Sequence, residues 1–141
     1  MSYATLADLI DQFDEHEVLA LTDRNGDGVP DAPLVARALL RASNTIDSYL
    51  AARYPLPLSV VPDQLVDLCC DITRYKLVGS TVTETEEVRN RYKDALKALA
   101  QIRDGELDIG LTVAGAAPAE NASVRVVGGG RVFSRASLSD F

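Results

Sequence analysis

The sequence of 141 residues predicts a small all-α protein: a bundle of three long and two short helices with an extended, partly β-like C-terminal arm. Apolar residues recur at helical spacing through most of the first 105 residues, and N-cap residues, prolines and glycines stand at the boundaries of these stretches. Hydrophobic residues make up 47% of the chain, enough for one core. We therefore expect a helical core over residues 1–105 and an arm over 106–141.

Two short helices are expected near the N-terminus. Thr5 is a typical N-cap residue, and Asp8 lies three positions on, in the first turn. The helix over about residues 5–13 has four apolar positions at helical spacing, Leu6, Leu9, Ile10 and Phe13. A second short helix over about 14–21 carries Val18, Leu19 and Leu21.

The first long helix is expected to begin after Asp31 or Ala32, with Pro33 in its first turn, where the missing amide hydrogen is not needed. Its apolar stripe extends the helix to about Arg53, through Val35, Leu39, Ala42, Ile46, Tyr49 and Leu50. Residues 54–62 hold three prolines, which exclude a continuous helix and favour an extended apolar connector. We expect its Leu56, Leu58 and Val60 to lie across the helices.

The second long helix is expected over about residues 62–78, with Gly79 at its end. Its inward positions are Leu65, Leu68, Cys69, Ile72 and Tyr75. Cys69 and Cys70 are adjacent, and neighbours on a helix face different directions, so they are interpreted as small core residues in a reducing compartment.

Thr83 or Thr85 is expected to cap the last long helix, which Gly105 ends. Acidic residues in its first turn are favoured by the helix dipole. Its apolar stripe consists of Val88, Tyr92, Ala95, Leu96, Leu99 and Ile102.

Helical spacing ends at residue 106. Residues 107–111 and 124–127 alternate like short strands, and three glycines follow at 128–130. The final residues, 131–141, mix basic side chains with apolar anchors. Such an arm is suited to docking on a partner, and plain disorder is the alternative.

Residues 23–31 match the first half of a calcium-binding loop, in which alternate side chains supply oxygen ligands and a glycine permits a sharp turn. The second half does not match, because the twelfth position, where a bidentate glutamate belongs, is Leu34. The alternative is a surface turn closed by its own side chains. The candidate metal ligands are Asp23, Asn25, Asp27 and Asp31.

The charge pattern argues against sequence-specific binding of nucleic acid. Residues 1–31 carry eight acidic side chains and one basic one, which accounts for the whole net charge of −7. No basic stripe is available to neutralise phosphates. We expect no membrane span and no signal peptide, because no apolar run and no basic leader of the required kind occurs.

No catalytic set is evident in the sequence. His16, the only histidine, sits among acidic residues of a short helix, with no neighbouring nucleophile or second metal ligand, and is expected on the surface. The carboxylates lie on positions expected to face solvent. We therefore expect a protein without enzymatic activity.

Six segments occur in an order that is informative as a set. They are Tyr-Ala-Thr-Leu-Ala-Asp-Leu-Ile (3–10), Leu-Thr-Asp-Arg-Asn-Gly-Asp-Gly (21–28), Ile-Asp-Ser-Tyr-Leu-Ala-Ala-Arg-Tyr-Pro-Leu-Pro-Leu (46–58), Cys-Asp-Ile-Thr-Arg-Tyr (70–75), Arg-Asn-Arg-Tyr-Lys-Asp-Ala-Leu (89–96) and Val-Phe-Ser-Arg (132–135). Together they resemble the Mu-like phage and prophage head–tail connector family, long catalogued as a domain of unknown function. Residues 46–58 are the most specific part, and their matching residues Ile46, Tyr49, Leu50, Tyr54 and Leu56 are expected in the core.

The resemblance implies a structural role. That family is similar to the adaptor proteins of long-tailed phages, small helical domains that form a ring under the portal. It implies a homo-oligomeric ring, expected to have twelve copies, which is assembled in the host cytoplasm and located in the virion neck. The ring would join the portal protein to a stopper or tail-completion protein, with DNA passing through its lumen.

The resemblance also suggests which residues act in assembly. The arm matches a segment that engages the portal or neighbouring subunits, and its candidate interface residues are Arg131, Val132, Phe133, Arg135, Leu138 and Phe141. The acids Asp8, Asp11 and Asp14 are candidates for lining the DNA channel, where repulsion would let DNA slide. The alternative function is a calcium-binding helical interaction module that uses the 23–31 loop.

Overall fold

The computed structural model describes residues 1–78 and 84–113, and in this part of the chain it confirms the all-α fold, with five helices and no strand. The helices are α1 (Leu6–Phe13), α2 (Glu15–Thr22), α3 (Ala32–Leu50), α4 (Asp63–Val78) and α5 (Glu86–Asp104). The expectations for Gly79, for a strand at 124–127 and for the glycines at 128–130 lie outside the described residues.

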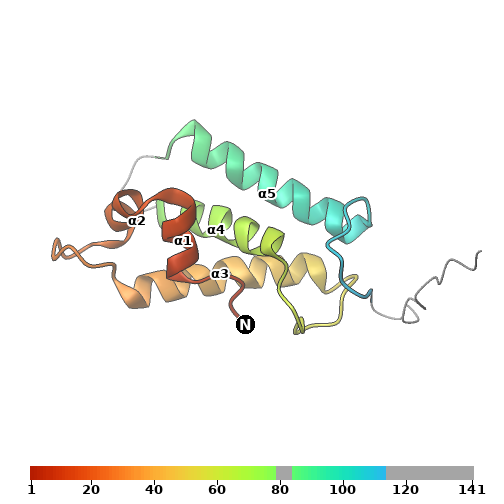
Figure 1. Ribbon diagram of the computed structural model, residues 1–141. Coiled ribbons are helices and arrows are strands. Elements are labelled where there is room, and N and C mark those ends of the chain that lie inside the picture. Colours follow the sequence, from red (N-terminus) through yellow and green to blue (C-terminus); the bar gives the residue numbers. More distant parts are fainter. Residues whose placement is uncertain (79–83, 114–141) are drawn as a thin grey trace, which may run out of the picture.

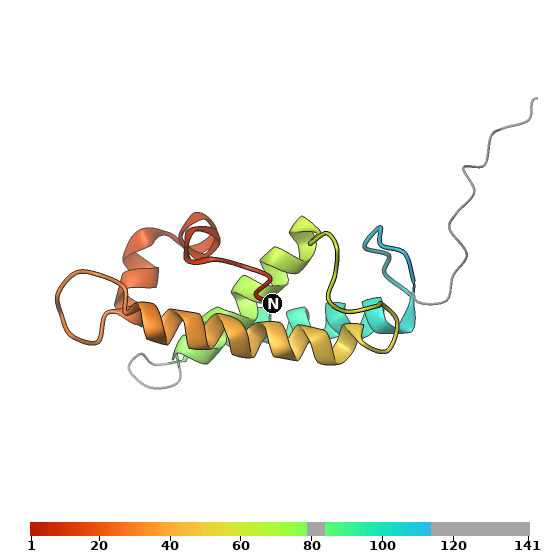
Figure 2. The same cartoon turned by 90° about the horizontal axis from the view of Figure 1, so that it is seen from below.

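The three long helices form the body of the molecule (Figure 1). Helix α4 packs against both α3 and α5, and the short helices α1 and α2 pack against α4 on one side of this layer (Figures 1 and 2). The largest fully buried side chains come from all five helices and from the turn after α3, and include Leu9, Thr22, Ile46, Leu50, Tyr54, Leu65, Ile72, Leu99 and Ile102. Cys69 and Cys70 are buried and unbridged in this core.

The helix starts follow from local chemistry. Thr5 and Asp8 form a capping box: the Thr5 amide donates to the Asp8 carboxylate at 2.7 Å, and the Asp8 amide donates to the Thr5 hydroxyl at 3.4 Å. Of the two threonines expected to cap α5, Thr85 does so, accepting from the Val88 amide at 3.3 Å. Pro33 lies in the first turn of α3, as expected.

Helix α3 ends at Leu50, three residues before the expected end. The amides of Arg53 and Tyr54 both donate to the Leu50 carbonyl, at 2.9 and 2.8 Å, and so close a turn. Pro55 disfavours helical geometry in the residue before it, which explains why the helix cannot continue. Tyr54 is turned inward and is 2% exposed.

The connector corrects one expectation about its apolar residues. Leu58 is buried, but Leu56 and Val60 are 36% and 63% exposed, so Leu56 is not a core residue. The chain bends at 56–57 and again at 59–60. Strict alternation of faces holds only along a straight extended segment, and these bends break it.

Residues 107–111 correct another expectation, because they form no strand. After α5, the amides of Glu106 and Leu107 both donate to the Gln101 carbonyl, at 2.9 and 3.2 Å, and turn the chain back. Ile109 is then buried, and three neighbours pack partly against the core, Leu107, Leu111 and Val113. The alternating apolar pattern indicates a half-buried segment. It does not form a strand, because no strand in the described part of the chain lies beside it to supply hydrogen bonds.

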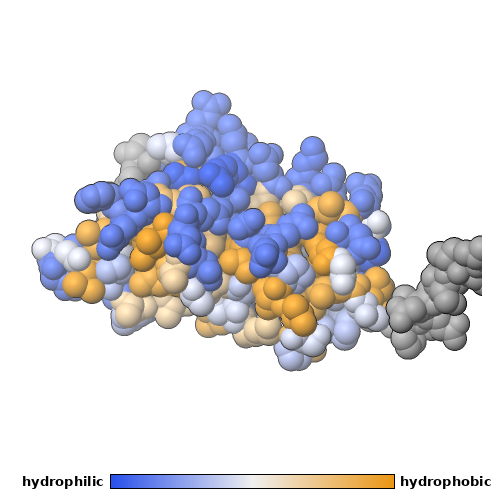
Figure 3. All heavy atoms as spheres, viewed as in Figure 1, coloured by the Kyte–Doolittle hydropathy of each residue, from blue (hydrophilic) through white to orange (hydrophobic). Residues whose placement is uncertain are grey.

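The surface has two different characters (Figure 3). Hydrophilic residues cover the side formed by α1, α2 and α5, whereas hydrophobic residues gather near the connector between α3 and α4. No helix in the described part of the chain is long and apolar enough to cross a membrane.

Candidate interaction surfaces

The 23–31 loop is closed on itself by Asp23. The Asp23 carboxylate accepts hydrogen bonds from the amides of Gly26 at 2.7 Å, Asp27 at 3.3 Å and Gly28 at 2.9 Å. These bonds, that of Gly28 above all, lower the pKa of Asp23. The Asp27 carboxylate accepts in turn from the Val29 amide at 3.0 Å. The loop has the internal bonding of a surface turn.

In residues 1–78 and 84–113 there is no group of three or more His, Cys, Asp or Glu side chains placed to hold a metal ion. Asp31 lies at the far end of the loop, where its amide donates to the Thr22 carbonyl at 3.1 Å and it precedes α3.

Two of the three acids expected in a DNA channel come together. Asp8 and Asp11 on α1 line a depression of about 240 Å³, and Asp67 in the second turn of α4 lines its other side. The five residues of this acidic cleft are Asp8, Asp11, Gln12, Val66 and Asp67. Asp14 lies at the junction of α1 and α2, with φ +77°, and does not line the cleft. Sequence reasoning missed Asp67, because its position opposite α1 depends on tertiary packing.

Arg74 was also missed, and it holds the short helices against the long ones. Its side chain is 9% exposed and binds Glu17 of α2, while a second nitrogen lies 3.4 Å from Glu87 of α5. Its guanidinium lies over the Phe13 ring, 4.6 Å from the centroid. The sequence contained a signal for this burial, because Arg74 lies four residues after Cys70 and therefore on the same face of α4 as that buried cysteine.

Arg91 covers the same ring from α5. Its guanidinium carbon is 5.2 Å from the Phe13 centroid, and its Nε lies 3.0 Å from Asp71 of α4. Gln12 of α1 donates to the same Asp71 oxygen at 3.2 Å. Burial raises the pKa of Asp71 although Arg91 opposes this effect. Phe13 therefore sits between two arginines that join α1, α4 and α5.

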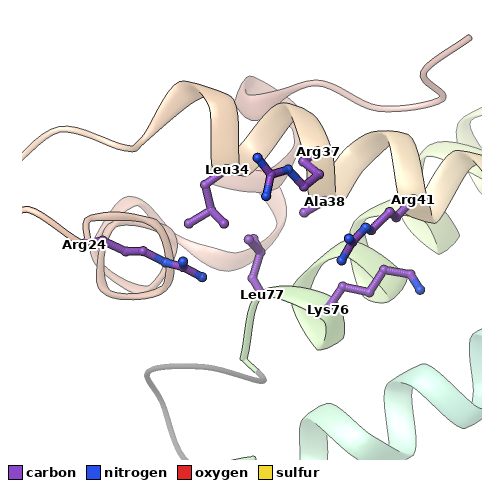
Figure 4. Close-up of a pocket in the computed structure, with 7 residues that line it drawn as sticks. All are labelled: Arg24, Leu34, Arg37, Ala38, Arg41, Lys76 and Leu77. Atoms are coloured by element: carbon purple, nitrogen blue, oxygen red, sulfur yellow. The ribbon is translucent and has the colours of Figure 1, made fainter.

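A basic pocket of about 240 Å³ lies between the 23–31 loop, α3 and the end of α4 (Figure 4). Three long cationic side chains, Arg37, Arg41 and Lys76, form no ion pair with any described residue. The pocket is lined by Arg24, Leu34, Arg37, Ala38, Arg41, Lys76 and Leu77. Sequence reasoning did not single it out, because its cations come from three separate segments.

A groove of about 270 Å³ lies at the opposite end of α3, between the connector and the segment after α5. The exposed side chains of Leu56 and Val60 belong to the same connector. The groove is lined by Pro55, Pro57, Leu58, Ser59, Gly110, Leu111 and Thr112. The predicted interface residues of the arm, Arg131, Val132, Phe133, Arg135, Leu138 and Phe141, lie outside the described residues.

Comparison with known proteins gives a consistent result. A family model described as "Bacteriophage Mu, Gp36" matches residues 3–127. "Gene product J" of Escherichia phage Mu is 39% identical over 137 residues, which cover 96% of each chain. The "Mu-like prophage FluMu protein gp36" of Haemophilus influenzae is 42% identical over 82 residues, covering 58% of this chain and 57% of the relative.

Proposed function

The chain belongs to the bacteriophage Mu Gp36 family, and from this premise we propose that it is the head–tail connector of a Mu-like phage. Its role is structural rather than catalytic. Copies assemble into a ring in the virion neck, which joins the portal protein to the stopper or tail-completion protein. DNA passes through the lumen without base-specific contacts. The resemblance of residues 46–58 to connector proteins is the sequence basis of the proposal.

The apolar end of the molecule is the observation that supports a joining role most directly. Leu56 and Val60 are exposed beside a groove that the first part of the arm, through Gly110, Leu111 and Thr112, helps to line. Exposed apolar side chains gathered around a groove are typical of protein interaction sites. Residues 54–62 and the arm, which contains Phe133, Leu138 and Phe141, would then form one docking surface for the portal protein.

A binding experiment with the portal tests this proposal. The portal ring of the same phage is sedimented with the wild-type chain, with a chain lacking residues 128–141, and with Leu56→Ser/Val60→Ser. We expect wild type to sediment with the portal and both variants to be lost from the pellet. Leu40→Ser is the matched control, because Leu40 is 50% exposed on α3 and outside the groove. A wild-type chain that stays in the supernatant would overturn the proposal.

A further inference from the structure

We propose that copies of this chain associate head to tail, with the acidic cleft of one copy seated on the basic pocket of the next. The inference rests on the proposed function only in so far as a ring needs contacts between copies. It adds the residues that make these contacts, and it assigns Asp8 and Asp11 to a contact between copies rather than to the wall of a DNA channel.

The basic pocket has the charge to attract an anionic partner. Arg37 and Arg41 of α3 and Lys76 of α4 line this pocket together with the apolar side chains of Ala38 and Leu77 (Figure 4). Three cations without a described counter-charge repel one another, so a carboxylate placed among them is attracted by all three. The apolar side chains of Ala38 and Leu77 can contact the hydrocarbon part of an acidic side chain.

The acidic cleft has the complementary properties. The carboxylates of Asp11 and Asp67 form no ion pair and no hydrogen bond with any described residue. The Asp8 carboxylate, in contrast, accepts hydrogen bonds from the amide and the hydroxyl of Thr5. Asp11 and Asp67 are therefore the carboxylates available to a second chain.

The two features lie on different sides of one molecule. In Figure 2, α1 and the beginning of α4 lie on one side of α3, and the carboxyl-terminal end of α4 lies on the other. Asp67 and Lys76 stand on the same helix, nine residues and about 14 Å apart along its axis. A chain cannot close its own cleft on its own pocket. Two different patches that meet between copies give a heterologous contact, which closes into a ring when the rotation permits.

Nucleic acid phosphate is the competing occupant of the basic pocket. The chain as a whole carries −7, so a polyanion is repelled at long range, whereas an acidic patch on a second copy is brought in together with that copy's own basic pocket. Charge complementarity therefore favours a second copy.

Charge exchange tests the contact. One variant, Arg37→Glu/Arg41→Glu, makes the pocket acidic and leaves the cleft acidic. The other, Asp11→Lys/Asp67→Lys, makes the cleft basic and leaves the pocket basic. Each variant alone presents like charges, so we expect its association constant, measured by sedimentation equilibrium at low salt, to fall at least about 100-fold. A mixture of the two variants restores both kinds of contact, and we expect association to recover.

Matched controls separate the contact from net charge. Lys93→Glu/Lys97→Glu and Glu86→Lys/Asp94→Lys make the same charge changes on exposed positions of α5 and are expected to associate like wild type. Circular dichroism confirms that each variant is folded. Raising the salt concentration should weaken wild-type association.

Three results would overturn the inference. They are a wild type that stays monomeric at the highest soluble concentration, variants that associate like wild type, and a mixture that fails to recover. If the wild type binds a short DNA duplex tightly and the Arg37→Glu/Arg41→Glu variant does not, the basic pocket is a phosphate-binding site instead. None of these measurements uses the portal, so a failure here leaves the portal experiment to decide the proposed function separately.

Discussion

Gly105 shows how a single residue ends a helix and admits a neighbour. It adopts φ +81° at the C-cap of α5, where its amide donates to the Ile102 carbonyl at 3.2 Å. A Cβ built there would lie 1.8 Å from a guanidinium nitrogen of Arg53. The glycine therefore serves both backbone geometry and close packing against Arg53 in the turn after α3.

Gly105→Ala should lower the free energy of unfolding by about 1–3 kcal/mol, because it adds left-handed strain and displaces Arg53. Gly110→Ala is the matched control, since Gly110 has φ +74° and open space around its Cβ position. Urea denaturation of both variants measures the difference. Equal losses would show that the Arg53 contact contributes nothing.

Asp23 makes loop stability depend on pH. Its carboxylate accepts backbone hydrogen bonds, chiefly from Gly28, so its pKa in the folded protein is below the ordinary value of 3.8. A lowered pKa means that the stabilisation is present above the unfolded pKa and is lost as the pH falls through the folded pKa. Asp23 therefore stabilises the folded protein at neutral pH and loses this effect in acid.

The stability difference between wild type and Asp23→Ala should be constant from neutral pH down to about pH 5 and should disappear in strong acid. Urea denaturation at a series of pH values measures it. Asp94→Ala, on the exposed face of α5, should show no such dependence. A difference that persists unchanged at the lowest pH would mean that the carboxylate charge is not what closes the loop.

Glu17 is a third residue with a measurable role. It is the principal partner of the nearly buried Arg74, which stabilises the packing of α2 on α4. Glu17→Gln weakens this pairing but leaves a hydrogen-bond acceptor. Because the Glu17 side chain is 38% exposed, we expect a loss of about 1–2 kcal/mol rather than the larger cost of a fully buried pair.

Urea denaturation again provides the measurement, and Glu15→Gln is the control, because Glu15 is exposed on the same helix. If the two variants lose the same stability, the Arg74 network does not hold α2 in place.

At the scale of the elements, the sequence predicted the helices well because their signals are local. Thr5, Thr85, Pro33 and Gly105 act on their own turns, so their effects can be read without knowing the fold. The strand expected at 107–111 was wrong for the opposite reason. Alternation indicates a half-buried segment, but a strand also requires a hydrogen-bonding partner, which tertiary structure supplies.

The segment after α5 is expected to behave as part of the helical core. Ile109 is 8% exposed, so Ile109→Ala should lower the free energy of unfolding by about 1–3 kcal/mol, less than for a residue at the centre of the core. Thr112→Ala, at an exposed position of the same segment, should change it little. Thermal and urea denaturation measure both. An Ile109→Ala variant as stable as wild type would place the boundary of the core at residue 105.

For the whole molecule, the surfaces proposed to act in assembly were the least predictable part. Arg37 and Arg41 stand on the polar face of α3, where a sequence suggests only solubility, and Lys76 joins them because α4 crosses α3 at that point. Asp11 and Asp67 are likewise brought together by the packing of α1 on α4. The sequence predicted an acidic N-terminal third, but it could not pair these acids with a basic counterpart on another side of the molecule.

The mass of the purified protein by light scattering, alone and with the portal ring added, decides between a head–tail connector and an unrelated helical protein. We expect a monomer at low concentration, and with the portal present a complex that contains the portal and a ring of chains. A chain that elutes at its own monomer mass and leaves the portal mass unchanged would contradict the head–tail connector role.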